Sequence, residues 1–220
     1  MLNAIGDVRR SGKRLKACYA CSYYSALRPE EAINLRWKNI VLASLEWNAD
    51  TEKWEVPGDD WGEFHLERAA PHAGKEWTDS GRHRDERGLK HRADDEVRVV
   101  PISPELAAIL RAHLDEFGTA PDGRLFQGER GEEVPVITYF RVWHKARAVV
   151  FTPEVAAGPL AKVPYDLRHA AVSTWLNGGV PATQVAEWAG HSVEVLHKVY
   201  AKCLDGQDRQ ARERMAAALK

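Results

Sequence analysis

The chain has 220 residues, of which 44% are hydrophobic, enough to bury the core of one ordinary domain. No apolar run reaches the roughly 18 residues of a membrane-spanning helix, and the polar, basic stretch 1–16 has no apolar signal core, so we expect a cytoplasmic protein without a membrane partner. The net charge is −1, from 31 basic and 32 acidic side chains, which argues against a protein that coats nucleic acid. Any nucleic-acid contact must therefore depend on local clusters of Lys and Arg.

The first predicted elements are two helices with an arginine between them. Residues 13–24 predict a buried helix rich in Ala, Cys and Tyr, and a turn at 25–26 follows. Pro29 suits the first position of the second helix, where its missing N–H is not needed. Arg28 is therefore held directly before a helix, although a surface arginine paired with Glu31 stays open.

Cys18 and Cys21 form a C-x-x-C inside the first predicted helix. This spacing can indicate a redox or zinc site, but no second pair follows. The apolar surroundings instead predict two thiols packed in the core. The three cysteines of the chain fit a reducing compartment.

Between residues 39 and 103 the pattern changes to strands. Segments 42–47 and 53–56 flank Asn48-Ala49-Asp50 and predict a hairpin, and 64–66 predict a short strand. Residues 71–88 are polar and contain glycine, so we expect a long flexible loop. Residues 96–102 predict a strand closed by Pro101.

Lys90 precedes this last strand and is separated from it by a turn-like segment. A lysine at a hairpin tip can reach into a cleft. Arg92 and Arg98 are rival candidates for the same role, and a solvated loop lysine is the simpler alternative.

The next region is helical. Ser103 and Pro104 predict the start of a helix that ends at Gly118. A further helix over 136–149 carries basic residues among aromatic ones, which fits a helix that packs on one face and contacts DNA phosphates with the other. The candidate DNA-binding residues are Arg141, Lys145 and Arg147. An ordinary amphipathic helix is the alternative.

Four helices are predicted at the end of the chain. Asp166 can cap a helix to Asn177, Pro181 opens one that stops at Gly190, Ser192 caps the helix that carries Tyr200, and 207–220 form the last. Arg168 is followed 23 residues later by His191, and Tyr200 lies 9 residues beyond. An arginine, a histidine and a tyrosine on such helices can meet around one phosphate.

Attack on a phosphodiester needs a nucleophile, cationic donors for the non-bridging oxygens and an acid for the departing oxygen. Arginine suits the second task because its planar fork grips two oxygens and stays charged. Each preorganised donor contributes roughly 3 kcal/mol, and a general acid adds about 10²- to 10⁴-fold. The sequence has no H-E-x-x-H, no paired C-x-x-C sites and no P-loop, so we expect neither a metal nor another cofactor.

These segments resemble the tyrosine recombinases, the phage integrase family. Residues 27–37 resemble the first arginine box, in which Glu follows Arg at the third position. Residues 165–169 resemble the second box, H-x-L-R-H, and 189–192 resemble L-G-H-S. Tyr200 lies where the family's nucleophile lies, and Lys90 resembles its hairpin lysine. The resemblance covers about residues 13–205.

The resemblance implies an α+β fold that is mainly α-helical, with a small antiparallel sheet or hairpin. Residues 1–205 would form the integrase catalytic domain, and the C-terminal helix over 206–220 would dock on a neighbouring protomer. We expect no counterpart of the family's N-terminal core-binding domain, because only about a dozen residues precede the first predicted helix. Double-stranded DNA is the implied partner, on which family members work as tetramers.

The resemblance also implies site-specific recombination through a 3′-phosphotyrosyl intermediate, with no ATP or metal. The implied roles are nucleophile for Tyr200, phosphate clamps for Arg28 and Arg168, acid for Lys90, phosphate donor for His191, and support for Glu31. The sequence departs from the family at Tyr165, where a histidine is usual. A phenol can donate a hydrogen bond but is a poor base near neutral pH.

Other functions remain open. Residues 171–200 contain a helix, a Gly-Gly turn and another helix, as in a non-catalytic helix-turn-helix DNA-binding module. A type IB topoisomerase-like enzyme would use the same chemistry to relax strands. Tyr165 also allows a decayed integrase that binds DNA without cutting it.

Overall fold

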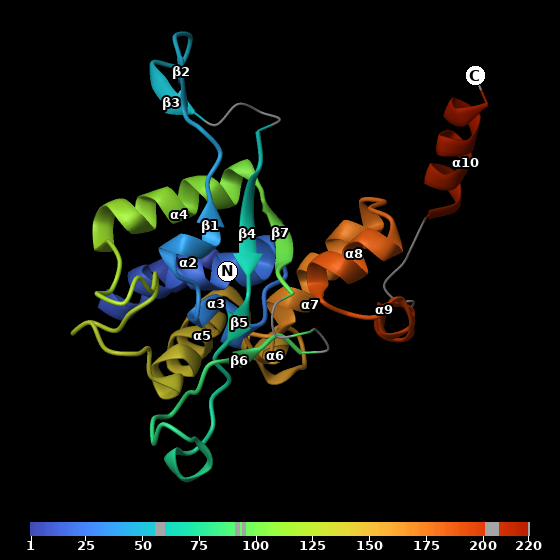
Figure 1. The fold of residues 1–220 in the computed structure, drawn as a ribbon. Coiled ribbons are helices and arrows are strands. Elements are labelled where there is room, and N and C mark those ends of the chain that lie inside the picture. The colour runs from blue at the N-terminus through green and yellow to red at the C-terminus, as the bar shows by residue number, and fades with distance from the viewer. Residues whose placement is uncertain (56–59, 91–92, 94–95, 201–206, 220) are drawn as a thin grey trace.

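The computed structural model describes residues 1–55, 60–90, 93, 96–200 and 207–219 (Figure 1). The predicted fold class is confirmed, because helices dominate and surround a small antiparallel sheet. Two helices form the N-terminus, α1 (Leu2–Gly6) and α2 (Arg9–Tyr24), the second beginning four residues before the predicted Lys13.

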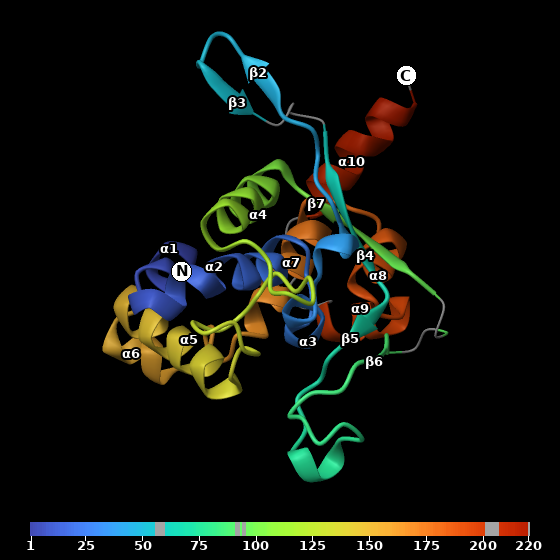
Figure 2. The same cartoon turned by 60° about the vertical axis from the view of Figure 1, so that its left-hand side comes forward.

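Helix α2 lies at the centre of the molecule. It contacts α1, α3 (Pro29–Ile33), α4 (Pro104–Phe117), α5 (Val136–Val150) and α7 (Asp166–Asn177). Both views place it between α4 and α5 (Figures 1 and 2). Its small side chains let these neighbours approach, and Cys18 and Cys21 are fully buried free thiols. The prediction of a core thiol pair is confirmed.

The main sheet has three antiparallel strands in the order β1 (Ile40–Val41), β4 (Gly62–Leu66), β7 (Arg98–Ile102). The 3₁₀ helix η1 (Trp37–Asn39) leads into it. Phe64 pairs with Val100, and buried and more exposed residues alternate along β4 and β7, because successive side chains of a strand point to opposite faces. β7 begins at Arg98, two residues later than predicted.

Two excursions leave the body of the molecule at opposite ends (Figures 1 and 2). The predicted hairpin is confirmed as β2 (Glu46–Asn48) and β3 (Lys53–Glu55), although its first strand starts later than residue 42, and residue 56 lies outside the described residues. The second excursion covers most of 71–88. It contains η2 (Lys75–Trp77), and its final strand β6 (Arg87–Gly88) pairs with β5 (Arg68–Ala69), so this segment has more secondary structure than the predicted loop.

The C-terminal part forms a second apolar cluster. Helix α6 (Pro153–Ala157) precedes α7, which is followed by α8 (Ala182–Ala189), α9 (Val193–Tyr200) and α10 (Gln207–Ala218). Tyr165, rather than Asp166, occupies the N-cap position of α7, and the Asp166 carboxylate accepts from the Val163 N–H at 3.1 Å. The cluster joins α7, α8 and α9 to the chain after α2 through Ala26, Ala171, Val172, Leu176, Val185, Ala189, Leu196 and Tyr200.

Helix α10 stands beside the body in Figure 1 and touches it through Arg214, which donates to the Gly178 carbonyl at 3.3 Å. No helix in the described part of the chain is both long and apolar enough to cross a membrane. The larger apolar cluster surrounds α2 and the sheet, and the seam between the two clusters contains the charged residues described next.

Candidate active site at the seam between two cores

The site is built around the carboxylate of Glu31, which is only 1% exposed. Arg28 occupies the N-cap of α3, and its backbone N–H donates to Glu31 Oε2 at 2.8 Å. This contact satisfies an amide at the helix start, where no intrahelical acceptor exists. The Arg28 guanidinium also donates to Glu31 Oε1 at 2.7 Å, so the arginine is fixed at two points.

Arg98 approaches the same carboxylate from strand β7. Its two terminal nitrogens donate to Glu31 Oε1 at 3.0 Å and to Oε2 at 2.6 Å, and Arg98 is itself 1% exposed. Burial alone would raise the pKa of Glu31, but Arg98, Arg28 and Arg168 together lower it to about 2. The carboxylate is therefore ionised at neutral pH and serves as an anchor for the arginines.

Arg168 extends from α7 into the same seam and is fully buried. Its guanidinium donates to the carbonyls of Ala26 and Ala189 and to Nε2 of His191, the last at 2.8 Å. Ala26 has a φ of 50°, a conformation that side-chain-bearing residues adopt at some strain. The residue with this strained backbone is the one whose carbonyl accepts a hydrogen bond from Arg168.

His191 follows Gly190, the left-handed residue that ends α8. The Gly190 carbonyl accepts from Arg28 at 2.8 Å, which ties this turn to the first arginine. Because Arg168 can only donate, Nε2 of His191 must accept, and the ring proton lies on Nδ1. Burial, together with the charges of Arg168, Arg28 and Arg98, lowers the pKa of His191 to about 4.

Tyr200 ends α9 and is 1% exposed. Its hydroxyl oxygen lies 2.8 Å from Nδ1 of His169, the residue directly after Arg168. Its ring also stacks on that of His191, with 6.2 Å between ring centres. The tyrosine therefore lies against both histidines of the site.

An open cavity of about 680 Å³ adjoins these residues. Arg28, Lys90, Tyr165 and His191 line it, with Lys90 exposed and following β6. The structure thus brings Lys90 to the site predicted from sequence. Its rival Arg98 is held by Glu31, and Arg92 lies outside the described residues.

The seam has the character of an anion site. Three guanidinium groups, from Arg28, Arg98 and Arg168, surround one ionised carboxylate. Within the described part of the chain, Nε of Arg168 and Nδ1 of His191 are buried without a hydrogen-bond partner. Buried donors are ordinarily satisfied, so these two fit a ligand rich in acceptor oxygens. No group of three or more His, Cys, Asp or Glu side chains among the described residues is arranged to hold a metal ion.

Comparison with known proteins finds similar folds among solved structures. No family model and no curated protein matches the sequence. Solved structures do match: the Tn1549 transposon integrase in complex with transposon right end DNA aligns with all of this chain at a TM-score of 0.66 and 16% identity. The XerH site-specific recombinase bound to difH substrate aligns with all of it at 0.58 and 14%, and the catalytic domain of bacteriophage HP1 integrase with 97% of it at 0.50 and 17%.

The chain has the fold of a tyrosine recombinase catalytic domain. It spans 63% of the Tn1549 integrase chain, 51% of the XerH chain and 88% of the HP1 catalytic domain. At these identities the likeness concerns the fold, and the roles of side chains must be argued from their contacts.

The three candidate DNA-binding residues of α5 in this recombinase fold differ in their environment. Arg147 is buried, and its guanidinium donates to the carbonyls of Ala156, Gly158 and Leu160, which close the loop around α6. All of the Arg147 fork is used inside the protein, which disfavours a contact between this residue and DNA. Lys145 is exposed.

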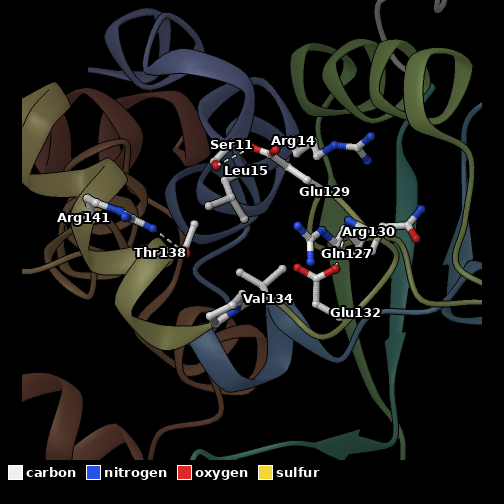
Figure 3. A pocket seen from close by; sticks show the side chains of 12 residues that line it. Ser11, Arg14, Leu15, Gln127, Glu129, Arg130, Glu132, Val134, Thr138 and Arg141 are labelled. Atoms are coloured by element: carbon white, nitrogen blue, oxygen red, sulfur yellow. Dashed lines mark hydrogen bonds between the residues drawn. The ribbon is translucent and has the colours of Figure 1, made fainter.

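Arg141 is exposed and donates to Thr138 at 2.9 Å. It lines a second cavity of about 540 Å³ between α2, α5 and the loop 127–134, together with Arg14 and Arg130 (Figure 3). Glu129 and Glu132 also line this cavity, and Ser11 donates to Glu129 at 3.1 Å. The mixed charge distinguishes it from the arginine-rich seam.

The sequence does not predict the positions of two residues of the site, Arg98 and His169. The sequence predicts Arg98 only as a rival to Lys90, and the resemblance to the H-x-L-R-H box gives His169 no role of its own. For Arg98 the sequence does contain a signal. An arginine at an inward-facing position of a strand is buried, and a buried arginine needs an acidic or polar partner. No local signal places His169 against Tyr200, 31 residues away.

Proposed function

We propose that this chain is the catalytic domain of a site-specific DNA recombinase that breaks and rejoins strands through a 3′-phosphotyrosyl intermediate at Tyr200. The observation that carries the proposal is the convergence of Arg28, Arg168, His191 and Tyr200 on one seam. These residues come from four separate segments, and their contacts leave a positive site beside an open cavity.

In this proposal the arginines bind the non-bridging oxygens of the scissile phosphate. Arg28 lines the cavity, and Arg168 has a buried Nε without a partner in the described chain. A preorganised donor of this kind contributes roughly 3 kcal/mol to the transition state. His191 adds its Nδ1–H as a third donor to the phosphate.

Glu31 and Arg98 position the clamp and do not touch the phosphate. The ionised carboxylate fixes Arg28 at two points and lies 4.0 Å from Arg168. This arrangement holds several like charges together before DNA arrives. The phosphate then meets donors that are already oriented, which is the basis of electrostatic catalysis.

Lys90 is the proposed acid for the leaving 5′-oxygen. It is exposed at the mouth of the cavity that Arg28 and His191 also line. Tyr165 lines the same cavity, where its hydroxyl can donate to the phosphate. The energy of the broken bond is kept in the phosphotyrosine, so a second 5′-hydroxyl can reverse the step without ATP.

Double-stranded DNA is the proposed partner, and assembly into a homo-oligomer on DNA is part of the proposal. The exposed Lys145 and Arg141 would contact the phosphate backbone. Helix α10, which touches the body through Arg214, would dock on a neighbouring protomer.

Covalent trapping tests the proposed function. The protein is incubated with a pool of nicked duplexes that lose a short 5′-hydroxyl fragment on cleavage, and the products are separated on a denaturing gel beside Tyr200→Phe. A shifted band that requires Tyr200 is expected, and sequencing its DNA gives the site. DNA binding by both proteins without any band would favour a non-catalytic DNA-binding module or a decayed integrase. Steady relaxation of supercoiled DNA without exchange of strands would favour a topoisomerase.

A further inference from the structure

His169 makes a direct contact with the proposed nucleophile. Its Nδ1 lies 2.8 Å from the Tyr200 hydroxyl oxygen, and the two rings are tilted by 50° with 5.6 Å between their centres. His169 extends from the first turn of α7 and Tyr200 from the last turn of α9. A proton can therefore pass between phenol and imidazole without an intervening water.

The surroundings of His169 favour its neutral form. Burial lowers its pKa from the ordinary value, Arg168 lowers it further, and Asp166 opposes them. The other titratable groups beside it are Tyr165, whose ring lies edge-on at 5.1 Å, His191 from the turn after α8, and Tyr200 itself. A neutral imidazole with its proton on Nε2 presents a lone pair at Nδ1, which can accept from the phenol.

The other candidates for this proton are less suitable. Nε2 of His191 already accepts from Arg168, and the ring's low pKa makes it a weak base. Tyr165 stands where the resembled family usually has a histidine, and it lines the cavity beside Arg28 and Lys90. A phenol is a poor proton acceptor near neutral pH.

We infer that His169 is the general base that removes the phenolic proton of Tyr200 during strand cleavage. This inference rests on the proposed function. As the Tyr200 oxygen forms its bond to phosphorus, its proton moves to Nδ1 of His169, and the bond from phosphorus to the 5′-oxygen breaks. Lys90 supplies a proton to that oxygen. In the rejoining step the 5′-hydroxyl attacks phosphorus and gives its proton to Lys90, the bond from phosphorus to the Tyr200 oxygen breaks, and His169 returns its proton to the departing phenolate.

The first test separates a base from an acid by changing the leaving group. The duplex recovered by trapping is made in two forms, one with the normal 5′-oxygen and one with sulfur at that position. A thiolate leaves without a proton because thiols are far more acidic than alcohols. Lys90→Ala should cleave the oxygen substrate slowly and recover on the sulfur substrate, whereas His169→Gln should stay about 10²- to 10³-fold slow on both.

A second readout is the dependence of cleavage rate on pH. With a histidine base, the rate of the wild type should rise with pH and level off above the pKa of His169, and His169→Gln should lose this rise. His169→Asn provides a second neutral variant, and urea unfolding shows that both are folded. The inference would be overturned if His169→Gln and His169→Asn cleaved at the wild-type rate. It would also be overturned if the sulfur substrate restored cleavage by these two variants.

A measurement on the free protein keeps this inference separate from the proposed function. Nitrogen-15 NMR of labelled histidines at pH 7 should show His169 with the proton on Nε2, and Tyr200→Phe should shift its Nδ1 resonance. A proton on Nδ1 would overturn the assignment even if DNA is cleaved. Absence of any Tyr200-dependent adduct in the wild type would overturn the proposed function and the catalytic role together, whatever the tautomer.

Discussion

Glu31 and Arg98 form a two-point ion pair in which neither side chain is more than 1% exposed. The pair joins helix α3 to strand β7 across 67 residues of sequence. Arg28 shares the same carboxylate, and Arg168 lies 4.0 Å from it. One buried anion thus organises the three arginines, and its removal should affect both stability and activity.

Glu31→Gln should strongly destabilise the protein. The neutral amide would leave buried guanidinium groups without their counter-charge, and breaking a buried ion pair in this way costs about 3–5 kcal/mol. Urea unfolding followed by circular dichroism measures the change. Glu30→Gln is the matched control, because this neighbouring carboxylate is only half-buried. Equal effects of the two substitutions would contradict the central role of Glu31.

The contribution of Glu31 to the free energy of unfolding should disappear in acid. Its folded-state pKa is about 2, against an ordinary value of 4.5, so the unfolded chain binds this proton first as the pH falls. The stabilisation is therefore complete above about pH 4.5 and is lost progressively as the pH falls toward about 2. The stability difference between wild type and Glu31→Gln, measured by urea unfolding from pH 7 to 2, should shrink in this window. A constant difference would contradict an ionised Glu31.

Gly190→Ala should disturb the arginine cluster. Gly190 has a φ of 62°, and an added Cβ would lie 2.3 Å from a terminal nitrogen of Arg98 and 3.4 Å from one of Arg28. Left-handed backbone alone costs roughly 1–2 kcal/mol for a residue with a Cβ, and displaced arginines would also lower strand cleavage. Gly81→Ala is the control, because Gly81 has a φ of 67° and no atom of the described residues lies within 4 Å of an added Cβ. Loss of cleavage in both variants alike would argue against a local effect.

Lys145→Ala should weaken DNA binding and Arg147→Ala should lower stability, although both residues lie on helix α5. Lys145 is exposed, so its removal should weaken DNA binding and reduce the slope of log affinity against log salt by about 1. Arg147 is buried against backbone carbonyls, so its removal should lower the unfolding free energy and leave the slope unchanged. Binding titrations at several salt concentrations, together with urea unfolding, distinguish the two. A reduced slope for Arg147→Ala would restore it as a phosphate contact.

Cys18 and Cys21 should resist alkylation in the folded protein. Burial raises the pKa of Cys18 to about 12 and raises that of Cys21 well above its ordinary value, so neither is a thiolate near neutral pH. Iodoacetamide at pH 8 should leave both unmodified until urea unfolds the chain, as peptide mass spectrometry would show. Rapid labelling of either under native conditions would contradict a core position.

Much of the fold could be predicted from local signals. Pro29, Ser103 with Pro104, and Gly118 mark helix ends as predicted, because capping and helix termination depend on a few adjacent residues. The resemblance to tyrosine recombinases predicts a site of Arg28, Lys90, Arg168, His191 and Tyr200, and in the structure these residues lie around one seam and its cavity. Strand starts were less accurate, since a strand is defined by the partner with which it pairs.

The contacts between distant segments were decided only by tertiary structure. Sequence gave Arg147 and Lys145 the same interpretation, but packing of α5 against the loop around α6 buries one and exposes the other. Arg98 pairs with Glu31 of α3, and His169 contacts Tyr200, because the two apolar clusters bring β7, α7 and α9 to one seam. Burial then makes each unpaired charge or donor expensive, so the chain fixes these partners in space although nothing in their local sequence specifies them.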